Sequence, residues 1–142
     1  DFGTVQPLAA ADARLSECIG TALYMAPEVE REPCSYGLAA DVFSFGVMLY
    51  ECYYYLEHGE DFYNGDFALF NGLEVVRTPL GEDPPRVPDR PASCADDEWD
   101  FLRKTLAPDE HERPRFVEAA QAWSKLSDVH SGGKLAKWLR TG

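Results

Sequence analysis

The amino-acid sequence predicts a mainly helical domain with long loops. Three observations support this fold class: a long apolar run from Asp41 to Leu56, two amphipathic segments with helical periodicity near the end, and no sustained strand-like alternation. The chain has 142 residues, of which 45% are apolar. It is therefore long enough and apolar enough to form one hydrophobic core.

The central element is predicted as a buried helix over residues 41–57. This segment is apolar on all sides and contains no proline, which is typical of a helix that is covered on every face. It is shorter than the ~18–20 residues needed to cross a bilayer, and Ser44 and Glu51 interrupt it. Asp41, just before the run, is expected to be the N-cap residue.

Two further helices are predicted over residues 96–127. An acidic first turn favours the start of the first helix, because carboxylates are stabilised near a helix N-terminus. Its inward face is predicted to consist of Trp99, Leu102 and Leu106. Pro114 is expected in the first turn of the second helix. The inward residues predicted for that helix are Phe116, Ala119, Ala120, Trp123 and Leu126.

The segments around these helices are predicted to be less regular. A short helix is expected over residues 66–76, although Gly72 weakens it. Five of the ten prolines fall within residues 79–91, which predicts a loop. Residues 131–142 form an expected C-terminal tail, in which a Ser-Gly-Gly joint leads to a short basic amphipathic end.

The charge of the chain argues against two classes of partner. It has 13 basic and 25 acidic side chains, a formal net charge of −12. An acidic domain repels phosphate backbones and anionic lipids, so we expect no nucleic-acid binding and no membrane binding. Four widely spaced cysteines and no signal peptide favour a cytoplasmic protein with reduced thiols. Because the first residue is Asp1, we expect additional sequence upstream.

Three motifs occur in a fixed order. The chain opens with Asp1-Phe2-Gly3, continues with Gly20-Thr21-Ala-Leu-Tyr-Met-Ala-Pro-Glu28, and then has Asp41-Val-Phe-Ser-Phe-Gly-Val47, followed at long range by Glu112-Arg113-Pro114. Together they resemble the C-terminal part of the eukaryotic protein kinase catalytic domain, from its Asp-Phe-Gly motif to its end. The resemblance implies the helical C-terminal lobe of an α+β kinase fold, with the N-terminal lobe and the catalytic loop absent. Residues 1–130 would be this partial domain, with an activation segment over 1–28.

The resemblance implies a nucleotide site at the start of the chain. Asp1 would bind the Mg²⁺ that bridges the phosphates of ATP, since a hard cation prefers carboxylate oxygens. Phe2 would pack beneath the nucleotide, and Gly3 would allow the backbone to pivot. Without the downstream motifs, a capping or surface aspartate would be the preferred interpretation of Asp1.

Further residues take roles from the same resemblance. Thr21 lies in a pattern similar to that of serine/threonine kinases, where it would position substrate against the catalytic loop; it could also be a simple turn hydroxyl. Glu28 and Arg113 would form a buried ion pair. Asp41 would hold the catalytic-loop backbone. Residues 41–46 and 113–116 resemble the tyrosine-kinase-like group.

The activation segment also offers regulatory hydroxyls. Ser16, with Thr4 as second choice, is the expected phosphorylation site, because added charge could order the segment against an arginine. The usual partner would be the arginine of the His-Arg-Asp motif, which this sequence lacks. Only Arg14 is close in sequence.

The functional hypothesis is therefore a fragment of an ATP-dependent serine/threonine kinase that acts on protein hydroxyls. The Gly-rich loop, the strand lysine and the His-Arg-Asp catalytic loop with its base do not occur in these 142 residues, so the fragment alone is expected to be inactive. A pseudokinase or interaction module without catalysis is the alternative. An upstream strand lysine and catalytic aspartate would favour the enzyme, and their absence would favour the binding module.

Overall fold

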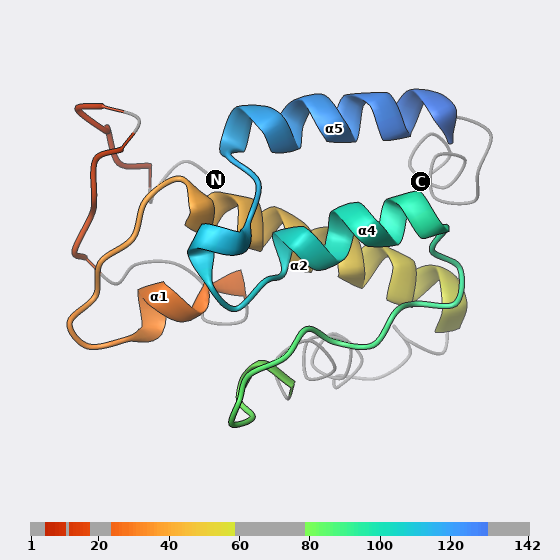
Figure 1. The fold of residues 1–142 in the computed structure, drawn as a ribbon, viewed down its shortest axis with the longest axis horizontal. Helices are drawn as coiled ribbons and strands as arrows, with labels where there is room; N and C mark the ends of the chain where they lie inside the picture. The colour runs from red at the N-terminus through yellow and green to blue at the C-terminus, as the bar shows by residue number, and fades with distance from the viewer. Residues whose placement is uncertain (1–4, 11, 18–23, 59–78, 131–142) are drawn as a thin grey trace.

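The fold is a layered packing of helices around one long central helix (Figure 1). The structure is a computed structural model that describes residues 5–10, 12–17, 24–58 and 79–130. Its helices are α1 (Pro27–Glu30), α2 (Ala39–His58), α4 (Asp96–Thr105), the 3-10 helix η3 (Glu110–Glu112) and α5 (Phe116–Val129). Within those ranges the only sheet-like pairing is an isolated antiparallel bridge between Leu15 and Tyr36. The described part is thus mainly helical, as the sequence predicts.

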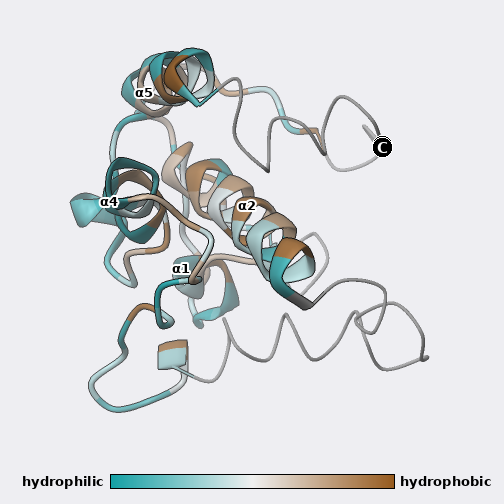
Figure 2. Cartoon of the chain, turned by 90° about the vertical axis from the view of Figure 1, so that its right-hand side faces the viewer, coloured by the Kyte–Doolittle hydropathy of each residue, from teal (hydrophilic) through white to brown (hydrophobic). Residues whose placement is uncertain are grey.

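Helix α2 forms the centre of the core, and α4 and α5 pack against it and against each other (Figure 2). Its buried side chains include Val42, Phe43, Val47, Leu49, Tyr50 and Tyr53. Met48 remains 46% exposed, so the helix is not covered on every side. No described helix is long and apolar enough to cross a membrane.

The expectation that Asp41 caps α2 is wrong. The helix begins at Ala39, and the backbone N–H of Asp41 already donates to the carbonyl of Leu38 at 3.1 Å. The N–H of Ala40 donates to Gly37 at the same distance, so the first turn closes before the aspartate. Asp41 instead lies in that first turn, where its negative charge still complements the helix dipole.

Helices α4 and α5 meet α2 through aromatic side chains. Trp123 of α5 lies 5.7 Å from Phe45 of α2, ring centre to ring centre, at 78°, and 5.8 Å from Phe101 of α4. Such edge-on and tilted contacts add to the energy of burial. One tryptophan therefore joins three helices.

The predicted start of α5 is wrong by two residues. The backbone at Arg115 is extended, and the helix begins only at Phe116, so Pro114 lies before the first turn. The carboxylate of Glu118 accepts a hydrogen bond from the N–H of Arg115 at 3.0 Å and closes this end. Phe116 is 49% exposed and Ala120 is also exposed, against expectation, whereas Ala119 is buried and Trp123 and Leu126 pack against the core.

The remaining segments follow the prediction only in part. Residues 81–91 are irregular, as the prolines suggest, but Pro79 and Leu80 have helical backbone. The hydroxyl of Tyr50 donates to the carbonyl of Asp89 at 2.8 Å and ties this loop to α2. The helix predicted over 66–76 and the tail over 131–142 lie outside the described residues.

The contact between α2 and α4 depends on the glycine at position 46. A Cβ atom on Gly46 would lie 2.4 Å from Oγ1 and 3.0 Å from Cβ of Thr105, which is fully buried. Gly46→Ala should therefore destabilise the chain by about 1–3 kcal/mol through overpacking, even though alanine favours helix by about 1 kcal/mol. Denaturant unfolding would measure this loss, and adding Thr105→Ala should recover part of it. A Gly46→Ala chain as stable as the parent would contradict this packing.

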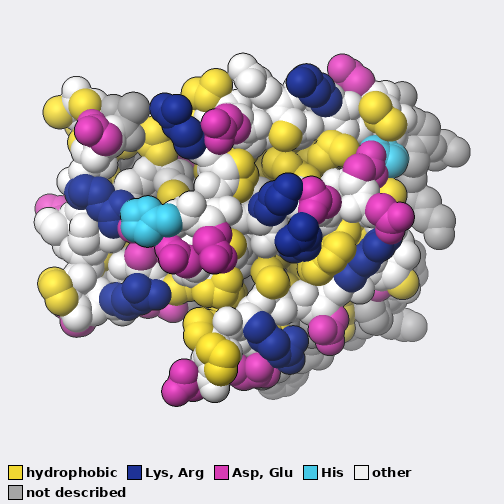
Figure 3. All heavy atoms as spheres, in the orientation of Figure 1, with side chains coloured by type: hydrophobic (Ala, Val, Ile, Leu, Met, Phe, Trp, Pro, Cys, Tyr) yellow, Lys and Arg dark blue, Asp and Glu magenta, His cyan; other side chains and the backbone are white. Residues whose placement is uncertain are grey.

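Charged side chains of both signs are mixed across the face drawn in Figure 3. Many of them form local pairs: Asp100 with Arg103 and Lys104, and Arg90 with Asp96 at 2.6 Å. Hydrogen bonds from Lys104 and Arg103 hold the pKa of Asp100 below its ordinary value. Exposed pairs such as these contribute little to stability.

The end of α5 carries a pH-sensitive pair. Nε2 of His130 lies 2.9 Å from both carboxylate oxygens of Asp97 at the start of α4, and this hydrogen bond raises the pKa of His130. Because the pKa of His130 is higher in the folded chain than in the unfolded chain, protonated His130 stabilises the fold. This stabilisation is complete below the unfolded-state pKa of about 6.5 and is lost as the pH rises through the folded-state pKa.

We therefore expect the melting temperature to fall slightly between about pH 6 and pH 8 because His130 loses its proton. His130→Gln should remove this component of the pH profile. His111→Gln is the matched control, since His111 is 84% exposed and lies 3.9 Å from its nearest carboxylate. Identical profiles for the parent and His130→Gln would contradict the assignment.

Candidate functional site

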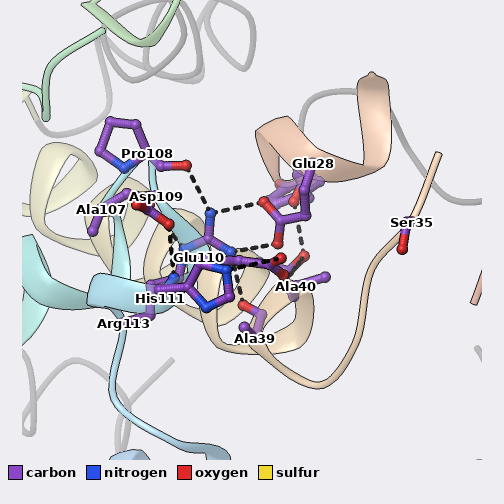
Figure 4. A network of polar contacts seen from close by, with 12 residues as sticks. Glu28, Ser35, Ala39, Ala40, Ala107, Pro108, Asp109, Glu110, His111 and Arg113 are labelled. Atoms are coloured by element: carbon purple, nitrogen blue, oxygen red, sulfur yellow. Dashed lines mark hydrogen bonds and ion pairs between the residues drawn. The ribbon is translucent and has the colours of Figure 1, made fainter. Parts of the chain in front are cut away.

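The best-defined polar site joins α1 to the segment after η3. Pro27 opens α1, and this one-turn helix presents Glu28 toward the core. Arg113 follows η3 in extended backbone conformation and points at the same place. Its Nη1 and Nη2 atoms donate to Oε1 and Oε2 of Glu28 at 2.6 and 2.9 Å (Figure 4). The two residues form a bidentate ion pair across 85 positions of sequence.

The ion pair is buried and fully hydrogen-bonded. The side chains of Arg113 and Glu28 are 0% and 7% exposed. The guanidinium also donates to the carbonyls of Ala107 at 2.8 Å, Ala39 at 3.0 Å and Pro108 at 3.4 Å. Each of its five N–H groups thus has an acceptor, which a buried arginine requires.

The same guanidinium stacks on the core. The Cζ atom of Arg113 lies 4.8 Å from the ring centre of Phe43 in α2, which is a cation–π contact. Arg113 therefore connects α1, the start of α2 and the loop between α4 and η3. It fixes the end of the Ala-Pro-Glu motif against the helical core.

A second set of bonds attaches the residues before α1 to α2. The hydroxyl of Tyr24 donates to the carboxylate of Glu51 at 2.8 Å. The Ser44 hydroxyl lies 2.8 Å from the carbonyl oxygen of Tyr24 and 3.1 Å from that of Ala40. The sequence analysis gave neither Ser44 nor Tyr24 a role in this attachment. Only its place between Thr21 and Glu28 could have indicated that Tyr24 anchors this segment.

Arg14 forms a third attachment, which sequence reasoning also missed. Its Nη1 and Nη2 atoms donate to Glu110 of η3 at 3.0 and 2.9 Å, and its Nε and Nη2 atoms donate to Oγ and O of Ser35 at 3.2 and 2.6 Å. The pairing raises the pKa of Arg14 and lowers that of Glu110. Ser16 is exposed, and the nearby Arg14 is engaged elsewhere. Phosphorylation of Ser16 remains a prediction.

Asp41 borders a pocket between the first segment and α2. The pocket has a volume of about 320 Å³, and its lining includes Leu8, Met25, Tyr36, Leu38, Asp41 and Ser44. Asp41 is an exposed residue, yet the protein around its carboxyl displaces enough water to raise its pKa. Its contact with a catalytic loop remains an expectation.

The nucleotide-site residues expected from sequence, Asp1, Phe2 and Gly3, are not among those described. Thr4, the second-choice phosphorylation site, and Thr21, the expected substrate-positioning residue, also lie outside the described ranges. Within those ranges no group of three or more histidine, cysteine or acidic side chains could hold a metal ion. The described site is thus an anchoring site that fixes the segment before α1.

Comparison with known proteins explains why these motifs assemble. The sequence pattern of the protein kinase domain matches residues 1–124, nearly the whole chain. The chain belongs to the protein kinase domain family. The chain is also similar to mitogen-activated protein kinase kinase kinase 6 of Homo sapiens, with 31% identity over 123 residues. The match covers 85% of this kinase-domain chain but only 8% of that relative's length.

Proposed function

We propose that this chain is the C-terminal lobe portion of a protein serine/threonine kinase of the tyrosine-kinase-like group. The intact parent would transfer the γ-phosphate of ATP to hydroxyl groups of protein substrates. The observation that carries the proposal is the buried ion pair between Glu28 and Arg113. It joins the Ala-Pro-Glu motif to a distant arginine, so the segment that would present substrate is held by the helical core.

The serine/threonine class is supported by the sequence from Gly20 to Glu28, with Thr21 in the position expected to meet the catalytic loop. The name of the related human protein says that its substrate is itself a protein kinase, a mitogen-activated protein kinase kinase. By analogy, another protein kinase is the proposed substrate class of the parent. Substrate hydroxyls would approach over the pocket that Met25 and Asp41 line.

ATP and Mg²⁺ are the proposed cofactors of the parent, with Asp1 as the metal ligand in this chain. A hard divalent cation suits a carboxylate, and phosphoryl transfer uses it to neutralise developing charge. The described residues do not form a metal site. Their proposed contribution is to position the activation segment, through Glu28, Arg113 and Ser44.

A transfer assay on the intact parent tests this function. We expect label from γ-labelled ATP on serine and threonine of acceptor peptides and not on tyrosine. Asp1→Asn should lower the rate on the order of 100-fold or more, because charge on the transferring phosphate loses its counter-ion. Asp12→Asn, an exposed aspartate of the same segment, is the matched control and should keep the rate. A folded parent that binds partners without transfer would instead favour the pseudokinase.

A further inference from the structure

Ser35 lies in the loop between α1 and α2, where its hydroxyl meets an arginine from a distant segment. Ser35 is exposed, and Nε of Arg14 donates to its Oγ at 3.2 Å. Nη2 of Arg14 also donates to the Ser35 carbonyl at 2.6 Å. The edge of the guanidinium formed by Nε and Nη2 therefore faces this serine.

The other edge of the same guanidinium is held by η3. Nη1 and Nη2 of Arg14 donate to the two carboxylate oxygens of Glu110, which fixes the plane of the group. Backbone hydrogen bonds of 2.8 and 3.0 Å between Leu15 and Tyr36 hold the two segments together beside it. Arg14 is thus already oriented toward Ser35, and ordering it would cost little additional entropy.

We propose that Ser35 is a phosphorylation site and that Arg14 binds the phosphate placed there. The phosphoryl donor is a nucleoside triphosphate, and a protein kinase catalyses the transfer. A bond forms between Oγ of Ser35 and the γ-phosphorus, the bond from that phosphorus to the β,γ-bridging oxygen breaks, and a nucleoside diphosphate leaves. The hydroxyl proton passes to the base of the modifying kinase.

The phosphate changes the local electrostatics in a defined direction. It adds a charge of about −1.5 to −2 and three acceptor oxygens at Ser35 Oγ, the atom to which Nε of Arg14 already donates. Glu110 opposes this charge, but Arg14 lies between the two anions and pairs with both. The phosphate therefore strengthens the link between residues 12–17 and the loop before α2.

Two other serines in the described part of the chain, Ser16 and Ser93, lack this arrangement. Ser16 is exposed and close to Arg14 in sequence, but the structure contains no hydrogen bond between them. The hydroxyl of Ser93 lies 2.9 Å from the carboxylate of Glu57, so a phosphate at that position would meet a like charge. Of these three serines, Ser35 alone has a guanidinium directed at its Oγ.

The first experiment places phosphoserine at position 35 of the full chain by genetic encoding and follows its ³¹P resonance against pH. An unperturbed phosphoserine has a second pKa of about 6. We expect this pKa to be about one unit lower in the chain than in its Arg14→Gln variant, because an opposite charge favours the dianion. Arg86→Gln is the matched control, since Arg86 is an exposed arginine with an equally close carboxylate partner, Glu82.

Hydrogen exchange provides a second measurement on the same samples. The amides of Leu15 and Tyr36 should exchange several-fold more slowly with phosphate at Ser35, and Arg14→Gln should remove the effect. A second pKa that is equal with and without Arg14, or unchanged exchange at both amides, would overturn phosphate binding by Arg14.

Occurrence is tested by peptide mapping with mass spectrometry of the chain expressed in a eukaryotic cell. Phosphate on Ser35, absent in Ser35→Ala, is expected. A chain that is phosphorylated elsewhere or not at all, with Ser35 unmodified, would overturn the modification. Neither test requires the parent to be an active kinase, so this proposal can fail or succeed independently of the proposed function.

Discussion

Removing either partner of the ion pair between Glu28 and Arg113 is expected to lower the free energy of unfolding by about 3–5 kcal/mol. Glu28→Ala leaves a guanidinium that is 0% exposed without its counter-charge. Arg113→Ala leaves the carboxylate unpaired and also deprives the carbonyls of Ala39 and Ala107 of a donor. In both variants the remaining charged group stays buried away from water without the ion pair that normally offsets its desolvation, so the folded state is destabilised.

A double-mutant cycle measured by denaturant unfolding isolates this interaction. We expect the loss in the double variant to be much smaller than the sum of the two single losses. The exposed pair of Glu82 and Arg86, with 43% and 50% side-chain exposure, is the matched control and should show coupling of about 0–1 kcal/mol. Additive losses at Glu28 and Arg113 would show that the two side chains are not coupled.

The 142-residue chain alone is expected neither to bind Mg-ATP tightly nor to transfer phosphate. Its sequence supplies Asp1 as one carboxylate for the metal but contains no Gly-rich loop, no strand lysine and no His-Arg-Asp aspartate. Mg²⁺ binds mainly through one or two carboxylates together with substrate phosphates, so unheld phosphates leave it weakly bound. Without the catalytic aspartate, no group orients the substrate hydroxyl.

Titration calorimetry with Mg-ATP tests whether the chain binds the nucleotide tightly, and a radiolabelled transfer assay tests whether it transfers phosphate. We expect no heat that fits a micromolar dissociation constant and no labelled product above a heat-denatured sample. Micromolar binding that Asp1→Ala removes would reveal a nucleotide site that these arguments miss. Transfer that survives in Asp1→Ala would instead indicate a contaminating kinase in the preparation.

The positions of the helices followed from local patterns in the sequence. A long apolar run without proline indicated a central helix over 41–57, and the structure has α2 over Ala39–His58. The exact starts of α2 and α5 did not follow, because backbone bonds made before Asp41 and the extended backbone at Arg115 decided them. Neither feature has a distinctive side chain to reveal it, and helix termini depend on such small differences.

The ordered motifs, read from the sequence by itself, determined the resemblance to protein kinases, and that resemblance implied the ion pair between Glu28 and Arg113 that the structure contains. Pairing of this kind is what two buried charges require. Only the tertiary structure decided the contacts of Arg14. The sequence placed this residue near Ser16, whereas the fold directs it to Ser35 and Glu110, the latter 96 positions away. Exposed side chains can pair with many partners at similar energy, so the path of the backbone selects among them.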